Sequence, residues 1–503
     1  MFKLPKSIRK SGGHTMCPHC WHTFDPRKSL YIENKSLASG DPVVGDHAQA
    51  RLAPEGVTID KVTGRIFDPD GYEMFERACP VCHLQVPADL LDKRPIIMSM
   101  AGAPASGKSY FITVMLHSLR RQLAAGFHLA FNYADSHDVQ NFIKHEDTLF
   151  HKKRGEAVCL PRTSTDGDDV NVQVSIEGTP IALPKAFLFS MQATPSNIES
   201  EAVQERLHQN FALYDNAGEL FDLQGPSDPT LRMTGHLRYC DIVFFVFDPL
   251  QDQDFRHKLR DISDDPQLDF FETEGRNRPQ DEILHAVANQ MKRLRGITGP
   301  KKIETPLLVV VQKYDAWKGL LPSHVKIDDS SVAMYEDAGT SGVDFAELNR
   351  ISLHLREFLN GVSPTFIATA EAAFGTVRYL PVSASGCSPT LDESTAQQVF
   401  RAGELKPWRV TDPMLWILQR FGLVRRARSK PAKNNAEIRR TAEGRLLVKL
   451  PDSGKSIWLD TEYAGSVIED PWTGDRVNVP SLETEPASSG HQAASDVDAI
   501  DEA

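Results

Sequence analysis

A glycine-rich segment at residues 102–109 carries the most specific chemical signal in this chain. Its sequence, GAPASGKS, fits the pattern GxxxxGK[ST] of phosphate-binding loops; an apolar run precedes it and a helical pattern follows it. Gly102 and Gly107 permit the tight turn, and backbone N–H groups from Ala105 through Ser106 to the helix start point at a β-phosphate. The segment therefore predicts a site for the phosphates of a nucleotide.

Polar side chains at and after this loop complete the predicted phosphate site. Lys108 bridges the β- and γ-phosphates, and the Ser109 hydroxyl takes one coordination position of Mg²⁺. Tyr110 follows at the helix start and belongs to the same predicted nucleotide-binding set. Asp215 begins a DxxG tetrapeptide after a short apolar run, where its carboxylate can hold Mg²⁺ through a water. Gly218 lets a backbone N–H reach the γ-phosphate, so this segment is expected to move when that phosphate leaves.

Two further motifs follow apolar runs and are suited to reading a base. Asp315 follows the run at residues 307–311, where its carboxylate can accept hydrogen bonds from guanine N1–H and N2–H₂. Adenine lacks both donors, so it would leave a buried carboxylate unpaired at a cost in affinity. The stem of Lys313 can cover the base, and the backbone N–H groups of Ser383 and Ala384 can donate to guanine O6. The order of the motifs therefore predicts a binding site for GTP or GDP.

The candidates for catalysis are Lys108 and three residues outside the glycine loop. Thr163 is the candidate switch threonine that senses Mg²⁺ and the γ-phosphate; the alternative is an ordinary loop threonine. Glu219 directly follows the DxxG segment, where it either activates the attacking water or leaves hydrolysis slow. Arg162 offers transition-state charge as an internal arginine finger, although most loop arginines are simply solvated.

Four cysteines form two CxxC pairs, and each such turn aims two thiolates at one point. Two turns together make a closed tetrahedral Zn²⁺ site of the structural kind. The intervening residues 21–78 exceed the usual zinc-ribbon spacing, so the unit carries an insertion. A redox dithiol is the weaker alternative, because neither pair lies in a βαβ context. His19 and His83 lie beside the pairs as possible substitutes or supporting residues. The predicted zinc ligands are Cys17, Cys20, Cys79 and Cys82.

Composition restricts the class of protein. A chain of 503 residues exceeds one ordinary domain, and its net charge of −12 argues against nucleic acid as a partner. No apolar run approaches the length of a membrane span, and the basic N-terminus lacks the apolar stretch of a secretory signal. CxxC pairs in a chain with an odd cysteine count favour reduced thiols and a cytoplasmic protein. The other cysteines are expected in the core: Cys159, Cys240 and Cys387.

Strand and helix patterns alternate from residue 94 onward, which predicts a three-layer α/β fold with a mostly parallel sheet. Continuous apolar runs such as 242–247 and 307–311 suit strands buried on both faces. The other expected strands are 96–100, 127–131, 182–191, 211–214 and 377–382, and the expected helices are 109–125, 281–295 and 345–359.

Changes in residue composition and in the strand and helix patterns divide the chain into parts. The predicted parts are a flexible arm (1–12), a zinc-ribbon-like domain (13–92), a P-loop domain with insertions (93–425), a basic linker (426–440), a small β appendage (441–480) and a disordered acidic tail (481–503).

The motif order over residues 94–425 resembles Ras-like GTPases of the translation-factor-related (TRAFAC) class. There are two departures: Gln312 stands where that family usually has Asn or Thr, and Glu219 stands where it often has Gln. With the zinc unit in front, the chain also resembles bacterial double-GTPase proteins of multi-component conflict (defence) systems, although one GTPase unit is evident here. In the family, the matching residues bind phosphate, Mg²⁺ and guanine: Lys108, Ser109, Asp215, Gly218, Lys313 and Asp315.

The resemblance implies a Mg²⁺-dependent GTPase that acts as a nucleotide switch, is slow without a partner, and contacts other proteins. Two alternatives stay open. One is a P-loop ATPase in which the KxD sequence occurs by chance, and the other is a zinc-containing scaffold that binds a nucleotide without hydrolysing it.

Overall fold

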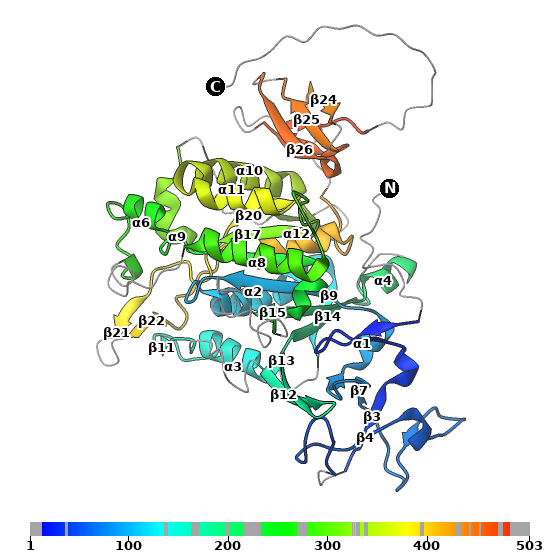
Figure 1. Cartoon of the computed structure of the whole chain (residues 1–503). Helices are drawn as coiled ribbons and strands as arrows, with labels where there is room; N and C mark the ends of the chain where they lie inside the picture. Colours follow the sequence, from blue (N-terminus) through cyan, green and yellow to red (C-terminus); the bar gives the residue numbers. More distant parts are fainter. Residues whose placement is uncertain are drawn as a thin grey trace, which may run out of the picture. The chain divides into compact units, whose positions relative to one another are not determined.

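The computed structural model of this chain divides into two compact units, Met1–Arg428 and Ser429–Ala503 (Figure 1). The predicted arm at 1–12 and nearly all of the predicted tail lie outside the described residues. The structure describes residues 13–35, 39–134, 139–161, 171–197, 201–215, 233–268, 279–323, 325, 327, 332–335, 341–392, 397–427, 434–441, 444–451, 454–470 and 476–482.

The described residues of the first unit contain a seven-stranded sheet in the order β10-β14-β15-β9-β16-β17-β20. The pairings from β15 to β20 are parallel, whereas β14 runs antiparallel to both β15 and β10. The sheet is therefore mixed, with its parallel part at the strands that carry the motifs. Its strands are β9 (Ile96–Gly102), β10 (Leu129–Tyr133), β14 (Phe187–Ala193), β15 (Gln209–Asp215), β16 (Ile242–Phe247), β17 (Leu307–Val311) and β20 (Val377–Pro381).

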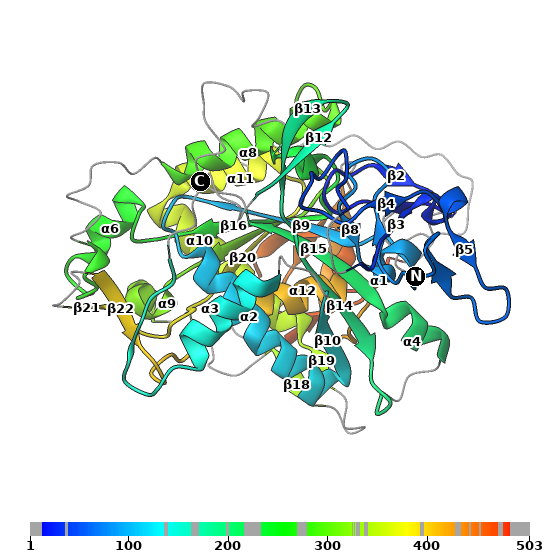
Figure 2. The ribbon, with the colours of Figure 1, turned by 90° about the horizontal axis from the view of Figure 1, so that it is seen from below.

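Helices cover both faces of this sheet, which gives the α/β layering that the alternating pattern predicts (Figure 2). In β16 the side chains alternate between two separate hydrophobic clusters: Phe245 packs on one face and Phe244 on the other. Because every position of the strand is buried, its sequence is continuously apolar rather than alternating. One face carries α8 (Gln280–Arg295) and α11 (Pro364–Ala373), and the other carries α2 (Lys108–Gln122), α3 (Val139–Phe150) and α12 (Asp412–Arg420).

Local signals set the ends of several helices. Gly107 precedes α2 in a left-handed conformation, and Gly296 ends α8 in the same way. The Asp344 side chain accepts a hydrogen bond from the Glu347 N–H at 3.0 Å and so caps α10 (Phe345–Val362). After α2 the chain makes a π-helical turn, η4 (Leu123–Phe127), so the predicted strand at 127–131 begins later, at Leu129.

The predicted single strand at 182–191 is in fact two strands. Its first part belongs to a hairpin of β12 (Asn171–Ile176) with β13 (Thr179–Pro184), and its second part is β14 of the main sheet. Pro184 cannot donate to a ladder, which is consistent with a strand that ends there. The remaining elements around the sheet are β11 (Ala157–Val158), α4 (Glu201–Leu207), η6 (Gly235–Arg238), α6 (Gln253–Leu259), α9 (Tyr314–Trp317), η7 (Lys318–Leu320), β18 (Ala333–Tyr335), β19 (Ser341–Val343), β21 (Thr390–Asp392) and β22 (Gln397–Arg401).

The cysteine-containing region is built from very short strands, and we call its described residues between 13 and 92 the cysteine unit. Its hydrophobic side chains belong to the same cluster as one face of the main sheet, so it forms one compact unit with that sheet. Its elements are β1 (Thr15–Met16), β2 (Thr23–Phe24), η2 (Pro26–Lys28), β3 (Leu30–Ile32), β4 (Arg51–Leu52), η3 (Pro54–Gly56), β5 (Thr58–Ile59), β6 (Ile66–Phe67), β7 (Arg77–Ala78), β8 (Gln85–Val86) and α1 (Ala88–Asp92).

The second unit is a small β structure that is described by itself. Two strands form within the predicted linker 426–440: β23 (Asn434–Asn435) pairs with β28 (Arg476–Asn478), and β24 (Glu437–Arg440) pairs with β25 (Arg445–Lys449). Among the described residues of the chain, no helix combines the length and apolar character that crossing a membrane requires. The strands and the one short helix are β23 (Asn434–Asn435), β24 (Glu437–Arg440), β25 (Arg445–Lys449), β26 (Ser456–Asp460), η8 (Thr461–Tyr463), β27 (Val467–Glu469) and β28 (Arg476–Asn478).

The three cysteines expected in the core differ in burial. Cys240 is buried and Cys387 is half-buried, but Cys159 is exposed, so the prediction is wrong for Cys159. Its neighbours Val158 and Leu160 are both buried. An extended segment alternates its side chains, which turns the residue between two buried positions toward solvent.

Candidate functional site

The predicted motifs meet at one edge of the main sheet, where its parallel strands end. The register pairs the last residues of these strands: Gly102 with Val246, Phe247 with Val311, and Val311 with Pro381. Only β16 lies between β9, which leads into the glycine loop, and β17, which leads to Asp315. At about 4.8 Å per strand spacing, the two strand ends lie about 10 Å apart.

The glycine loop has the backbone of a phosphate cradle. Gly102 has φ +153°, and a Cβ there would lie 2.6 Å from the Val246 carbonyl oxygen, so only glycine fits. Ala105 and Gly107 also have positive φ angles, of 57° and 84°. The Ser106 hydroxyl is fully buried and has no hydrogen-bond partner within the described part of the chain. This polar atom under the loop fits a site that receives a polar ligand.

Lys108 bends back over this loop. Its Nζ donates to the carbonyl oxygens of Gly102 at 3.1 Å and Ala103 at 2.8 Å. The Gln251 amide also donates to the Pro104 carbonyl at 3.0 Å, which ties the loop to the segment after β16. Phosphate oxygens placed in the loop would offer the Lys108 ammonium stronger, charged acceptors than these carbonyls.

Ser109 and Asp215 come together as the sequence predicts for a magnesium site. The Ser109 hydroxyl lies 3.5 Å from Asp215 Oδ2, and Asp215 Oδ1 has no partner among the described residues. Burial raises the pKa of Asp215, and the Lys108 charge and the Ser109 hydroxyl oppose that rise. Hydroxyl and carboxylate oxygens are the ligands that Mg²⁺ takes, so this pair fits the ion.

Several predicted residues of the phosphate end cannot be placed. Thr163, Arg162, Gly218 and Glu219 lie outside the described residues. Tyr110 can be placed, and its hydroxyl accepts a hydrogen bond from the Leu160 N–H at 2.8 Å. Its ring also packs edge-on against Phe400, with a centroid distance of 5.5 Å. The Tyr110 side chain therefore binds the chain just before the predicted switch segment.

The predicted base end is assembled around Asp315. Its Oδ1 accepts a hydrogen bond from the Ser383 hydroxyl, which in turn accepts one from the Gly386 N–H at 2.7 Å. Burial raises the pKa of Asp315, and the Ser383 hydrogen bond opposes that rise. Gly386 has φ +72°, and a Cβ there would lie 2.0 Å from the Lys406 carbonyl oxygen, so this turn also requires glycine.

One predicted donor to guanine O6 is already used within the protein. The Ser383 N–H donates to the Trp408 carbonyl at 3.0 Å, and the Trp408 N–H donates back to Ser383 at 2.8 Å. This pairing differs from the sequence prediction, which could not place a residue 25 positions away (383 to 408) against this turn. Ser383 acts through its side chain on Asp315, and Ala384 remains the candidate backbone donor.

Lys313 has a partner that the sequence reasoning missed. Its Nζ lies 2.7 Å from Oδ2 of the fully buried Asp248 and also contacts the Gln267 side-chain oxygen. Burial raises the pKa of Asp248, and the Lys313 charge opposes that rise. Asp248 directly follows the apolar strand β16, and Asp215 is in the same way the last residue of β15. A carboxylate at the end of a buried strand is the sequence signal that could have identified Asp248.

The base end has two further features, a stacked pair of aromatic rings and a buried glutamine. The Trp408 ring stacks on Tyr314 at 3.9 Å between centroids, with 6° between the planes. Gln312 is buried, its carbonyl accepts the Trp317 indole N–H at 2.7 Å, and its side-chain Nε2 has no partner among the described residues. This amide stands at the position where the resembled family usually carries Asn or Thr.

The four cysteines of the two CxxC pairs form one cluster. All four sulfur atoms lie within 4.8 Å of one another. The distance is 3.6 Å between Cys17 and Cys82, and 3.7 Å between Cys20 and Cys79. Sulfurs about 2.3 Å from a tetrahedral zinc ion stand about 3.8 Å apart, so the cluster could hold zinc.

The two neighbouring histidines bind other groups. His19 Nε2 lies 3.0 Å from the Gln85 carbonyl oxygen, and His83 Nδ1 lies 2.9 Å from the Asp41 carboxylate. Neither ring nitrogen with these contacts is available to replace a cysteine ligand. The cluster of possible metal ligands in the described part of the chain consists of the four cysteines and includes neither histidine.

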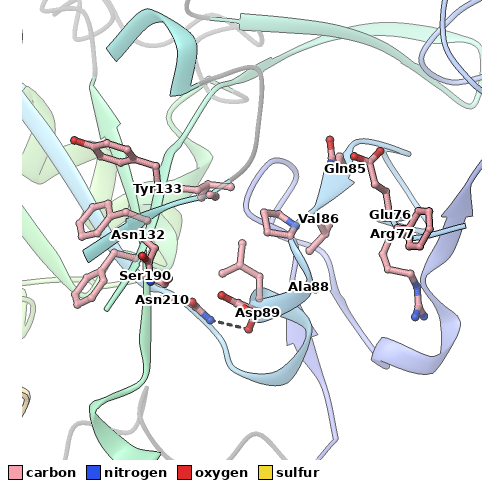
Figure 3. A pocket seen from close by; sticks show the side chains of 17 residues that line it. Glu76, Arg77, Gln85, Val86, Ala88, Asp89, Asn132, Tyr133, Ser190 and Asn210 are labelled. Atoms are coloured by element: carbon pink, nitrogen blue, oxygen red, sulfur yellow. Dashed lines mark hydrogen bonds between the residues drawn. The ribbon is translucent and has the colours of Figure 1, made fainter. Parts of the chain in front are cut away.

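A separate cavity of about 340 Å³ lies between the cysteine unit and the edge of the main sheet (Figure 3). The Asn210 amide donates to the Asp89 carbonyl oxygen at 2.7 Å and so links its two walls. Tyr133 and Ser190 line the wall formed by the sheet, and Gln85 and Val86 line the opposite wall. Neither Lys108 nor Asp315 lines this cavity, so it is distinct from the motif-bearing edge.

Comparisons with known proteins find one curated relative and several solved structures, while no protein-family model matches. The relative, from Mycolicibacterium smegmatis, is described as "Putative ESX-1 scaffolding and assembly protein SaeC". It is 24% identical over 357 residues, which cover 69% of this chain and 80% of the relative.

The solved structures include Sup35 with GDP, which is 14% identical and has a TM-score of 0.20. They also include the GTP-bound GTPase-like domain of S. cerevisiae Ski7, which is 11% identical and has a TM-score of 0.23. The matches cover 59% of this chain and 39% of the Sup35 chain, and 71% of this chain and 58% of the Ski7 chain. At TM-scores this low, the likeness carries no argument about the present chain.

Proposed function

We propose that this protein is a Mg²⁺-dependent guanine-nucleotide-binding protein that hydrolyses GTP slowly unless a partner assists. The observation that carries the proposal is the meeting of Lys108, the Ser109–Asp215 pair and Asp315 at one edge of one sheet. A cation, a magnesium pair and a base-reading carboxylate there match the three parts of a Mg²⁺-nucleotide. Adenine lacks the adjacent N1–H and N2–H₂ donors of guanine that would face the Asp315 carboxylate.

In this proposal the protein contributes positioning and charge rather than a covalent intermediate. Loop N–H groups and Lys108 hold the β- and γ-phosphates, and Ser109 with Asp215 holds Mg²⁺, which neutralises charge that develops on the phosphate oxygens. Asp315, kept in place by the Ser383 hydroxyl, accepts from the guanine edge. Thr163 and Glu219 remain the proposed switch threonine and water-activating residue.

We further propose that the cysteine cluster holds a structural zinc ion. Four sulfur ligands leave no open position for a substrate, which is the pattern of a structural site. The thiolates must stay reduced to bind zinc, which is consistent with a cytoplasmic protein.

The wider role that we propose is assembly of a multi-protein system. The support is the relative SaeC, whose description names scaffolding and assembly. Because that relation stands at 24% identity, the partners of this chain are left to experiment. A role in a bacterial defence system, which the sequence resemblance raised, is a proposal of the same kind.

Two measurements test the nucleotide proposal. The first identifies any nucleotide that copurifies with the protein and titrates labelled GDP against labelled ADP in the presence of Mg²⁺. We expect GDP to bind at least about 10-fold more tightly, which corresponds to about 1.4 kcal/mol. Equal binding of the two nucleotides would instead favour the ATPase alternative.

The second measurement separates a GTPase from a non-hydrolysing scaffold, which the relative's description makes the leading alternative. Phosphate release from GTP is followed over hours, with the Lys108→Ala variant as the background. We expect slow release above that background. Tight GTP binding without release above the background would identify the scaffold.

A further inference from the structure

The first cysteine turn, residues 17–21, touches the strand that carries Asp215. The Trp21 indole N–H donates to the Tyr214 hydroxyl at 3.0 Å, and that hydroxyl contacts the Pro18 carbonyl oxygen as a donor. Tyr214 is 1% exposed and directly precedes Asp215 at the end of β15. One phenol hydroxyl thus joins both sides of the cysteine turn to the residue next to the predicted magnesium ligand.

The same aromatic cluster reaches the strand before the glycine loop. The Tyr214 ring stacks on His236 at 4.3 Å, and His236 Nε2 lies 3.1 Å from the Ser99 hydroxyl on β9. Burial lowers the pKa of His236 to about 3, so the ring is neutral at physiological pH. Gly235 allows the close approach, because a Cβ there would lie 2.5 Å from the Trp21 ring.

The second cysteine turn, residues 79–83, has the same backbone but other neighbours. The Trp21 N–H donates to the Cys17 carbonyl at 3.1 Å, and the His83 N–H donates to the Cys79 carbonyl at 3.0 Å. Trp21 and His83 share a left-handed conformation, with φ 58° and 57°. His83, however, contacts Asp41 inside the cysteine unit. The first turn thus contacts β15 through the Trp21 side chain and the Pro18 carbonyl, whereas the His83 side chain of the second turn contacts Asp41.

We propose that Trp21 and Tyr214 are positioning residues of the nucleotide site, and that metal binding by the cysteines and Mg²⁺-nucleotide binding strengthen each other. This inference rests on the proposed function. With a metal ion bound, Cys17 and Cys20 would hold the left-handed turn that presents Trp21 and the Pro18 carbonyl to Tyr214. The two hydrogen bonds then fix the end of β15, and with it the Asp215 carboxylate opposite Ser109. Thermodynamic reciprocity requires the coupling to act in both directions.

The test compares the dissociation constants of labelled GDP with and without Mg²⁺ in full-length variants. Tyr214→Phe keeps the ring and loses the hydroxyl, and Trp21→Phe replaces the indole by a smaller aromatic ring that has no N–H donor. His83→Phe is the matched control in the second turn. We expect the Mg²⁺-dependent gain in affinity to fall about 3- to 10-fold in the first two variants, the range for a lost buried hydrogen bond. The control should keep the wild-type gain, and zinc content should stay unchanged in Tyr214→Phe.

A second readout tests the reverse direction of the coupling. The rate of zinc transfer to the chelator 4-(2-pyridylazo)resorcinol is measured with and without Mg²⁺-GDP, and we expect the nucleotide to slow transfer about 3- to 10-fold in the wild type. Tyr214→Phe should abolish that slowing, which a merely structural role would not do.

The inference would be overturned if the wild type binds the nucleotide and both variants keep the full Mg²⁺-dependent gain in GDP affinity. That result would leave the proposed function standing. Failure of the wild type to bind any guanine nucleotide would overturn both.

Discussion

The phosphate end and the base end of the candidate site are built in different ways. The phosphate end comes mostly from eight consecutive residues, 102–109, whose turn is set by Gly102 and Gly107. The base end joins the ends of β16, β17 and β20 through side chains, with Asp248 on Lys313 and Ser383 on Asp315. The proposed phosphate end is therefore local in the sequence, whereas the proposed base end depends on partners far apart in the chain.

The two lysines show the same contrast. Lys108 donates to neutral carbonyl oxygens of its own loop, and its charge also acts on the carboxylate of Asp215, the predicted magnesium ligand. The Lys313 charge is instead balanced by the buried carboxylate of Asp248. A nucleotide should therefore meet a net attraction at its phosphates and a neutral, hydrogen-bonding surface at its base. The following changes test that separation.

The largest effect is expected from Lys108→Ala. Truncating one partner of a buried charged contact costs roughly 2–5 kcal/mol, so affinity should fall by about 30-fold or more. The loss should be equal for GDP and for pyrophosphate, which lacks a base, when both are titrated calorimetrically. The control is Lys313→Ala, which should leave pyrophosphate binding intact; an equal loss there would contradict the separation of the two ends.

Asp315→Asn should affect only ligands that carry guanine. The amide offers one acceptor and places its NH₂ against a guanine donor. GDP affinity should therefore fall by about 5- to 150-fold, from roughly 1–3 kcal/mol for unpaired buried groups. Pyrophosphate affinity should not change. Titrations of GDP and pyrophosphate on the same preparation check this, and a parallel loss of pyrophosphate binding would show that the two ends are coupled.

Asp248→Asn should weaken the base end through Lys313. The substitution leaves the ammonium group without its anion beside a buried amide, and we expect the free energy of unfolding in urea to fall by about 1–3 kcal/mol. GDP affinity should also fall several-fold while pyrophosphate binding persists. Unchanged stability would mean that the Asp248–Lys313 pair contributes no net energy, as some buried ion pairs do.

The smallest effect expected is a pH dependence with opposite signs for folding and for binding. Burial raises the pKa of Asp215 and of Asp315 above the ordinary 3.8, so the folded protein protonates them more readily than the unfolded chain. Their contribution to stability is therefore lost as pH rises from 3.8 through the raised values. Nucleotide affinity should rise over the same window, because Mg²⁺ and guanine both require the carboxylates.

Titrations of GDP between pH 4.5 and 7 measure this dependence. In Asp315→Asn the part of the pH dependence that comes from the base end should disappear. The Mg²⁺-dependent part, which comes from Asp215, should remain. A pH profile that is identical in the variant and the wild type would assign the whole effect to the phosphate end.

The sequence predictions were accurate where a structure depends on interactions between residues close in the sequence, and less accurate where it depends on distant ones. The strands β16 and β17 were predictable, because burial on both faces demands continuous apolar runs. The predicted strands at 127–131 and 182–191 were misplaced, because a π-helical turn and a separate hairpin occupy part of each range. Cys159 was assigned to the core on residue type alone, and its extended backbone turns it outward.

By itself, the sequence determined the glycine loop, the CxxC turns and the buried strands, since each depends on backbone freedom or burial within a few residues. Only the tertiary structure decided that Lys313 pairs with Asp248, 65 residues away, and that Trp21 meets Tyr214, 193 residues away. Such side chains become neighbours because strand order and register bring distant segments to one edge, and no local pattern of residues specifies that order.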